Sequence, residues 1–504
     1  MKKTVLLILS VILVLPVLCA ASANARTDVI IGEIGEPASF DPHINDKIVG
    51  IVINQNVYES LLALDEEGNV IPWLCESYEV SEDGTVYTFH LREGVKFQNG
   101  DPMTAEDVVY SLNKAAASPY CAEAADTIDH AEIIDEKTVK MVMKYAFMVQ
   151  EQNLTTTYCA IVNKKIAEEK GELFGVDPGL SGTGPYKFES WNKGVEVVLS
   201  RNEEYWGNKP AMEKVTFRFY NDATAGDIAV ETGEIDAFLN PSNYELALFE
   251  SNENITVYSA ASHYCESMAL NTTYGPLSDV RVRQAISLCI NREDVMIAGV
   301  GPTGGVTTGV FTAPSLFGSA YDLIPVPQKD TEKAKQLLAE AGYPNGFEIT
   351  LMTVDGIRAK HAQVIQQALA EIGITATIDM NESNAFYDKM MKGEYQIGFH
   401  GFTTLTNDAD TMTYLLFESS GIGVYNYAQY KNEEVDRLLR DSRTQLDKGI
   451  REKDFIEAQK IIADECPDIP LYLKTTNNIA NSKLLGFKAD PNNILKVTTL
   501  SWGE

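Results

Sequence analysis

The chain has 504 residues, and its 72 acidic residues outnumber the 41 basic ones, which gives a formal net charge of −31 at pH 7. Such a charge opposes binding to nucleic acid or to anionic lipid headgroups, although a solvated coat without functional meaning explains it equally well. The apolar content of 45% is ordinary for a globular protein. The length exceeds what one hydrophobic core accommodates, so two or three subdomains are expected.

The N-terminus has the pattern of a secretory signal. Two lysines precede an almost unbroken apolar run over residues 5–18, which is short for a membrane span, and the A-x-A sequence at 23–25 fits a cleavage site. We therefore predict a signal peptide over residues 1–25 and an exported chain that begins near Arg26. A lipid anchor at Cys19 and a retained anchor helix are the alternatives. No later stretch is apolar enough to span a bilayer.

The first half of the mature chain carries strand and turn signals. Residues 79–92 alternate in the manner of a hairpin around the turn Asp83-Gly84. Thr104 and Asp107 have the spacing of a capping box that opens a helix. No internal repeat or low-complexity linker is present, so the subdomains are expected to exchange chain more than once.

The second half predicts a parallel α/β unit. In chain order we expect a helix that begins near 278–279, a helix over 331–341, a strand over 348–354, a helix over 359–372 that stops at Gly373, and strands over 374–378 and 396–400. A strand, a helix and a second strand at this spacing indicate a right-handed parallel connection.

Motifs for phosphate, metal and nucleophile chemistry are missing. The glycine-rich segment 181–185 lacks the ending of a phosphate loop and predicts a tight turn before a strand, and 299–309 predicts a flexible segment that lines a cleft. The six histidines show no metal-binding spacing, the cysteines form no C-x-x-C pair, and no G-x-S-x-G sequence occurs. We predict no catalytic residue, no metal site and no cofactor. Buried free cysteines are favoured, with a disulfide as the alternative.

The loop that follows the third parallel strand is a candidate for ligand binding. The carboxyl ends of parallel strands face a crevice where small ligands bind. Residues 401–410 supply hydroxyl groups, one aromatic ring and two carboxylates, a mixture that suits a small-ligand pocket. Alternatively, Asp408 and Asp410 cap a helix over 412–417.

Short motifs spread over the mature chain are shared, in this order, with one family. They are 36–43, 58–59, 68–73, 81–85, 89–97, 104–108, 182–187, 201–207, 233–236, 279–285 and 341–344. Together they resemble the family 5 solute-binding proteins, the peptide- and nickel-binding components of ABC importers.

The resemblance implies an α/β, type II periplasmic-binding-protein-like fold with two lobes and an extra inserted subdomain. The first lobe would comprise 26–57, 182–268 and 474–504, the insert 58–181, and the second lobe 269–473. The strands that cross between the lobes would lie near 268–271 and 469–472. The resemblance also implies a monomeric, non-enzymatic protein of the periplasm or cell envelope. It would close on a small solute by hinge motion and deliver it to a membrane permease.

The identity of the ligand is where the sequence departs from this family. Its peptide binders place an aspartate shortly after a Gly-Trp pair, to meet the peptide's amino group, but here Gly401-Phe402 stands in place of that pair and Leu405 in place of the aspartate. Its nickel binders place a histidine where Asp410 stands. A peptide or peptide-like compound is expected. The alternative ligand is a metal chelate or another cationic solute. The alternative roles for the protein are a sensor for a membrane receptor and an exported hydrolase.

The candidate ligand-binding residues lie in loops and strand ends that should face the cleft. They are Ser39, Phe40, Asn240, Tyr244, Tyr264, Glu266, Ser267, Thr307, Thr308, Phe402, Thr403, Thr404, Leu405, Thr406, Asp408 and Asp410. Among these we expect Asp408, Asp410 or Glu266 to meet a positive group of the ligand, because charge-assisted hydrogen bonds are the strong ones.

Overall fold

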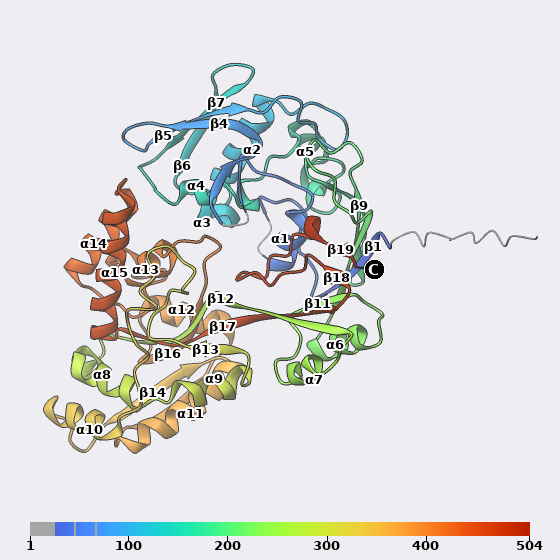
Figure 1. The fold of residues 1–504 in the computed structure, drawn as a ribbon. Helices are drawn as coiled ribbons and strands as arrows, with labels where there is room; N and C mark the ends of the chain where they lie inside the picture. Colours follow the sequence, from blue (N-terminus) through green and yellow to red (C-terminus); the bar gives the residue numbers. More distant parts are fainter. Residues whose placement is uncertain (1–25, 45–46, 66–67, 504) are drawn as a thin grey trace, which may run out of the picture.

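The computed structural model describes residues 26–44, 47–65 and 68–503. The predicted signal peptide, its cleavage site and Cys19 lie outside these residues. The dominant element is one mixed sheet, here called the central sheet, with the strand order β15-β14-β16-β12-β17-β11-β1-β10-β9-β8 and with β13 paired to β17 (Figure 1).

One end of the central sheet is the predicted parallel unit. The strands β14 (Glu348–Thr353), β15 (Thr375–Met380) and β16 (Ile397–Phe402) pair in parallel, with Leu351 opposite both Ile378 and Ile397. The helix α11 (Ile357–Glu371) connects β14 to β15, and Gly373 follows it with a φ of 87°. The predicted helix stop and the parallel pairing are therefore both confirmed.

Two long strands lie in the middle of the central sheet and connect its two ends. The strands β12 (Ile255–Leu270) and β17 (Asp468–Asn481) pair antiparallel over most of their length, and β12 also pairs with β16. The family resemblance indicated only the ends of these strands, near 268–271 and 469–472, because the remaining residues alternate too weakly between apolar and polar to stand out as strands. These paired strands link the two halves of the chain.

The other end of the central sheet collects segments from distant parts of the chain. Its strands are β1 (Asp28–Ile34), β8 (Tyr186–Asn192), β9 (Glu196–Arg201), β10 (Lys214–Tyr220) and β11 (Ala237–Leu239). The helices here are α1 (Ile48–Asn54), α6 (Ala223–Glu231) and α7 (Leu246–Glu250). Val29, Ile31, Val215 and Phe217 are buried in the core of this end.

Segment 58–181 has a second sheet and a hydrophobic core of its own. The sheet order is β4 (Cys75–Val80), β5 (Val86–Leu91), β7 (Thr138–Met143) and β6 (Ile128–Ile133), which confirms the predicted hairpin. Phe89, Leu112 and Met141 are buried in its core. The other elements are β2 (Leu62–Leu64), β3 (Val70–Pro72), α2 (Ala105–Ala117), α3 (Ala122–Ala125), α4 (Gln150–Asn153) and α5 (Lys164–Lys170).

The remaining elements surround the parallel unit or close the C-terminus. They are α8 (Val280–Cys289), α9 (Arg292–Val300), β13 (Gly305–Thr307), α10 (Thr331–Glu340), α12 (Ser383–Lys392), α13 (Asp410–Phe417), α14 (Glu433–Thr444), α15 (Lys448–Glu465), β18 (Leu484–Leu485) and β19 (Ser501–Trp502). Short 3-10 turns occur at 119–121, 157–159, 171–175, 275–278, 419–421 and 497–499.

The two glycine-rich segments have structural explanations. A Cβ atom at Gly182 would lie 2.1 Å from the carbonyl oxygen of Val57, so this glycine permits a close backbone approach just before β8. The expectation of a flexible loop at 299–309 is wrong for 305–307. Those residues form β13, which pairs with β17 from Gly305 to Thr307.

The capping box of α2 gives a local stability prediction. The Thr104 hydroxyl accepts the Asp107 N–H, and the Asp107 carboxylate accepts the Thr104 N–H at 2.9 Å. We expect Thr104→Ala to lower the free energy of unfolding by about 1 kcal/mol, measured by urea denaturation. Thr104→Ser keeps the hydroxyl and should stay close to wild type. Equal losses for both variants would contradict a capping role.

Two further findings concern cysteines and membranes. The six cysteines of the described residues are all free, and all but the half-buried Cys466 are buried, as the sequence favoured. They are Cys75, Cys121, Cys159, Cys265, Cys289 and Cys466.

Across residues 26–44, 47–65 and 68–503, no helix combines the length and the apolar character that crossing a membrane requires.

Candidate functional site

Two cations share one buried carboxylate where β12, β17 and α11 meet. Glu266 on β12 is 1% exposed, and its Oε2 accepts a hydrogen bond of 3.3 Å from Arg358 Nε. The ammonium of Lys474, on β17, lies 3.4 Å from Glu266 Oε1. With Tyr264 and Tyr387 we call this group the cationic cluster. Its net charge is +1 in a chain whose net charge is −31.

The two tyrosines fix the cations of the cluster. Arg358 Nη1 donates to the Tyr387 hydroxyl at 2.9 Å, and Nη2 donates to the Tyr264 hydroxyl at 3.0 Å. The Lys474 ammonium lies 3.9 Å from the centroid of the Tyr264 ring. A guanidinium has five N–H donors, so Arg358 keeps donors for a further partner, and the Lys474 ammonium does as well.

The location of the cluster follows from the topology. Arg358 stands at the start of α11, directly after β14, and therefore at the carboxyl end of the parallel strands. Gly401 on β16 is next to it, because a Cβ atom there would lie 2.2 Å from the Tyr264 hydroxyl. This edge is where open parallel sheets bind ligands.

Solvent reaches the cluster although protein surrounds it. The Lys474 side chain is 31% exposed, yet burial lowers its pKa. Lys496 in the C-terminal segment shows the same combination. It is exposed, and burial nevertheless lowers its pKa. Lys474 therefore keeps contact with water although protein surrounds it on several sides. We call the surroundings of its side chain the recess.

The loop after β16 contacts segment 58–181. The Asn407 N–H donates to Gln152 Oε1 at 2.7 Å, and the Leu405 N–H donates to Glu123 Oε1 at 3.5 Å. Nearby, the Met148 N–H donates to the carbonyl oxygen of Arg443 at 3.1 Å. The two parts of the chain therefore meet at the side where α3 and α4 approach α13 and α14 (Figure 1).

Asp408 and Asp410 are occupied by cations of the chain itself. Asp408 accepts two hydrogen bonds from Arg451, at 2.6 and 2.8 Å, and Asp410 accepts from Arg443 Nε at 3.0 Å. Both aspartates are buried, at 2% and 1% exposure. Asp408 also accepts the Asp410 N–H. The N-cap residue of α13 is Ala409 and no side chain caps the helix, so the capping alternative is wrong, and the pairing with Arg451 gives Asp408 a structural role. Neither aspartate therefore has a carboxylate that is free to meet a positive group of the ligand. Glu266, the third residue predicted for this role, is paired as well.

Several other predicted residues are buried against protein. Phe40 is 1% exposed and packs on Phe188 and Trp191 in the core, so it is a core residue and not a cleft residue. The hydroxyls of the others bond within the chain: Ser39 to the Asp41 N–H, Thr308 to the Val310 backbone, Thr404 to Thr406, and Ser267 to His400.

The remaining predicted residues keep contact with solvent. Tyr264, Thr307, Phe402, Thr403 and Leu405 are half-buried, and Asn240 and Tyr244 are exposed. Only Tyr264 and Glu266 of the predicted set belong to the cationic cluster. Phe402 packs on Tyr425, with ring centroids 5.4 Å apart.

Three residues of the cationic cluster were not predicted from the sequence, namely Arg358, Lys474 and Tyr387. The position of Arg358 at the first turn of the helix after a parallel strand was a usable signal. Lys474 had none, because it reaches the cluster only through the pairing of β17 with β12.

A serine, a histidine and an aspartate also meet, but not in the arrangement of a hydrolase. Ser267 Oγ lies 2.9 Å from His400 Nε2, and Asp468 Oδ2 lies 2.6 Å from the same nitrogen. A catalytic triad needs the nucleophile and the acid on opposite ring nitrogens. All three residues are also buried. This network is therefore structural.

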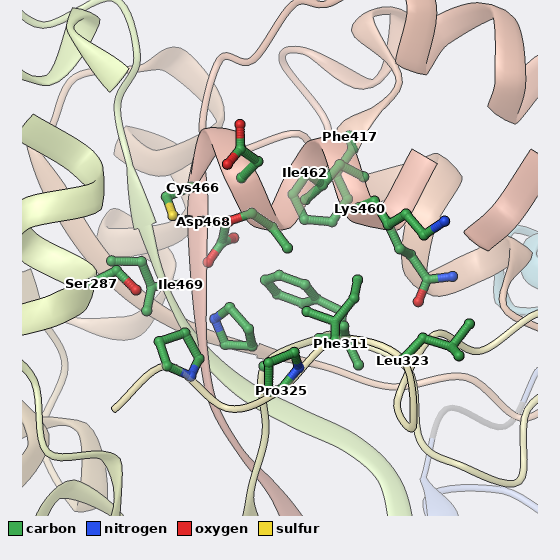
Figure 2. Close-up of a pocket in the computed structure, with 18 of the residues that line it drawn as sticks. Ser287, Phe311, Leu323, Pro325, Phe417, Lys460, Ile462, Cys466, Asp468 and Ile469 are labelled. Atoms are coloured by element: carbon green, nitrogen blue, oxygen red, sulfur yellow. Dashed lines mark hydrogen bonds between the residues drawn. The ribbon is translucent and has the colours of Figure 1, made fainter. Parts of the chain in front are cut away.

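A separate pocket of about 380 Å³ lies entirely within residues 287–470. Figure 2 shows Phe417 and Ile462 on helices and Phe311 and Pro325 on the connecting chain below them. All of its walls come from one part of the chain, and it includes none of the residues of the cationic cluster. In the described part of the chain, no three histidine, cysteine, aspartate or glutamate side chains converge to hold a metal ion.

Comparisons with known proteins identify the family of the chain. The model of the bacterial extracellular solute-binding proteins, family 5 (Middle), matches residues 69–423. The glutathione-binding protein GsiB of Shigella boydii serotype 4 is 30% identical over 484 residues, which cover 93% of each chain.

Two solved structures share the fold. The periplasmic binding protein DppA of Helicobacter pylori, in complex with the peptide STSA, has a TM-score of 0.78 at 28% identity and covers 95% of this chain and 99% of its own. HbpA2 of Haemophilus parasuis has a TM-score of 0.86 at 26% identity. The match covers 95% of this chain and 100% of the HbpA2 chain. The chain thus belongs to the family 5 bacterial extracellular solute-binding proteins, with their type II periplasmic-binding-protein fold, and is a substrate-binding component of an ABC importer.

Proposed function

We propose that the solute is a short peptide or peptide-like compound and that the cationic cluster binds its carboxylate. The observation that carries this proposal is the sharing of Glu266 by Arg358 and Lys474, which leaves one positive charge unbalanced. An unbalanced charge in a partly desolvated place is costly, and a ligand carboxylate would compensate it. Charge-assisted hydrogen bonds from a guanidinium and an ammonium are suited to this group.

The position of the cluster supports capture by closure. Its residues come from the two strands that link the halves of the chain, from the first turn of α11 and from α12. We propose that 26–57, 182–268 and 474–504 form the first lobe, 58–181 its insert and 269–473 the second lobe. A ligand held at the strands between the lobes contacts both of them, and therefore favours the closed state that a permease recognises.

The relatives support the chemical class of the solute. One is named for binding glutathione, and another was solved with the peptide STSA. Peptides carry a carboxylate at one end, which fits the sign of the cluster. A positively charged solute is disfavoured at the same place, because Arg358 and Lys474 would repel it.

Further parts of the proposal concern the state of the protein. The family is one of binding proteins and not of enzymes, and we propose that this member has no enzymatic activity. It would act as a monomer, be exported to the periplasm or cell-envelope space, and dock on ABC permease subunits in the membrane. The acidic surface is consistent with a role that involves no nucleic acid.

The test combines ligand discovery with a matched panel. Mass spectrometry of compounds released from the purified protein should find a carboxylate-bearing peptide or peptide-like molecule. In thermal-shift assays, glutathione, the peptide STSA and a library of dipeptides to tetrapeptides should stabilise the protein in their free-acid forms. The same peptides with an amidated C-terminus should stabilise it much less. Equal shifts for acid and amide forms would contradict carboxylate recognition.

A further inference from the structure

A carboxylate of segment 58–181 faces the loop after β16 without a cation to balance it. Glu123 lies in α3 and is exposed, and its Oε1 is 3.5 Å from the backbone nitrogen of Leu405. Within the described residues, neither the ion pairs nor the charges that act on Glu123 include a lysine, arginine or histidine. This differs from an ordinary exposed acid such as Glu132, which pairs with Lys140.

Glu123 lies where segment 58–181 contacts the loop after β16. Burial raises the pKa of Glu123, and the Leu405 N–H only partly offsets this rise. The residue is nevertheless exposed. Contact with water together with desolvation is the combination found at Lys474 and Lys496. Glu123 therefore stands at the contact between segment 58–181 and the second half of the chain and is still reached by water.

Glu123 is also close to the cationic cluster along the chain. Gly401 touches the cluster through the Tyr264 hydroxyl, and Leu405 contacts Glu123. The four intervening peptide units span at most about 14 Å when fully extended, and less in a bent loop. An extended peptide of roughly two to four residues has a comparable length.

We propose that Glu123 binds the free amino group of the ligand, opposite the carboxylate held by the cationic cluster. The inference rests on the proposed function, because it assumes a peptide-like ligand in that cluster. An amino group is protonated at neutral pH and pairs well with a carboxylate that lacks another cation. The contact with the ligand's amino group would come from the insert and not from the loop after β16. The ligand would then connect the two parts of the chain across the recess.

The experiment measures two contrasts separately, with three forms of each peptide. A library of dipeptides to tetrapeptides is prepared with free ends, with an acetylated N-terminus and with an amidated C-terminus. Dissociation constants are measured by calorimetry for wild type, for Glu123→Gln and for Glu136→Gln. The last variant removes an equal charge from an exposed residue between β6 and β7. Glutamine at 123 keeps an oxygen for the Leu405 N–H.

The expected result is a loss of amine selectivity only in Glu123→Gln. Wild type and Glu136→Gln should bind free peptides about tenfold to a hundredfold more tightly than acetylated ones. Glu123→Gln should bind the two forms alike while still preferring a free carboxylate over an amide. An unchanged amine preference in Glu123→Gln would overturn the inference and leave the proposed function intact. Loss of the carboxylate contrast in wild type, or no binding by any form, would overturn the proposed function itself.

Discussion

Replacing Arg358 with glutamine is expected to weaken binding of a carboxylate-bearing ligand by about tenfold to a hundredfold. A charge-assisted hydrogen bond contributes roughly 1.5–3 kcal/mol, and about 1.4 kcal/mol corresponds to a factor of ten in the dissociation constant. Arg358 contacts Glu266 and both tyrosines of the cluster. Lys474→Gln should have an effect of the same direction, because it removes the second cation. Isothermal titration calorimetry with peptides from the thermal-shift library measures both.

The control for this prediction is the charge of the ligand. If the loss reflects a missing contact, affinity for the C-terminal amide of the same peptide should change little in Arg358→Gln. Lys483→Gln, an exposed position just beyond β17, should leave the affinity for both forms at the wild-type value. Equal losses for acid and amide would show that Arg358 only maintains the shape of the recess.

Replacing Arg451 with methionine is expected to lower the free energy of unfolding by about 3–5 kcal/mol. The guanidinium lies 5.1 Å from the ring centroid of Phe317 and 4.9 Å from that of Phe455, and it donates to both oxygens of Asp408. Its removal leaves a buried carboxylate without a counter-charge, and this, more than the lost contact itself, is costly. Urea denaturation followed by circular dichroism measures the loss.

Two further variants separate the buried pair from charge in general. Arg437→Met removes a half-exposed cation paired with Glu434 and Asp441, and should cost at most about 1 kcal/mol. The double variant Arg451→Met with Asp408→Leu should recover much of the stability, because no unpaired charge remains. A loss below 1 kcal/mol in Arg451→Met alone would refute the structural role assigned to Asp408.

Local signals in the sequence were sufficient for many of the elements. The turn at Asp83-Gly84, the capping box at Thr104 and the stop at Gly373 depend on a few adjacent residues. Their chemistry acts through backbone geometry that neighbours fix. The order of short motifs was likewise enough to indicate the family and, through it, the two-lobed α/β architecture.

The roles of polar side chains were harder to predict from the sequence, because their partners are distant in the chain. Asp408 and Asp410 were attractive as ligand contacts, but Arg451 and Arg443, more than 30 residues away, neutralise them. Phe40 lies within the motif 36–43 and yet packs in the core. The sequence contains 72 acidic and 41 basic residues, so it cannot indicate which of them become pairs.

The sequence by itself therefore determined the class of the protein, its local elements and the strand edge at which a ligand should bind. The tertiary structure alone decided which charges remain available at that edge. The pairing of β17 with β12 brings Lys474 to Glu266, and the contact of α3 with the loop after β16 brings Glu123 to the backbone of Leu405. Burial makes the balance of charge at each place matter energetically, and burial is a property of the folded chain and not of any segment.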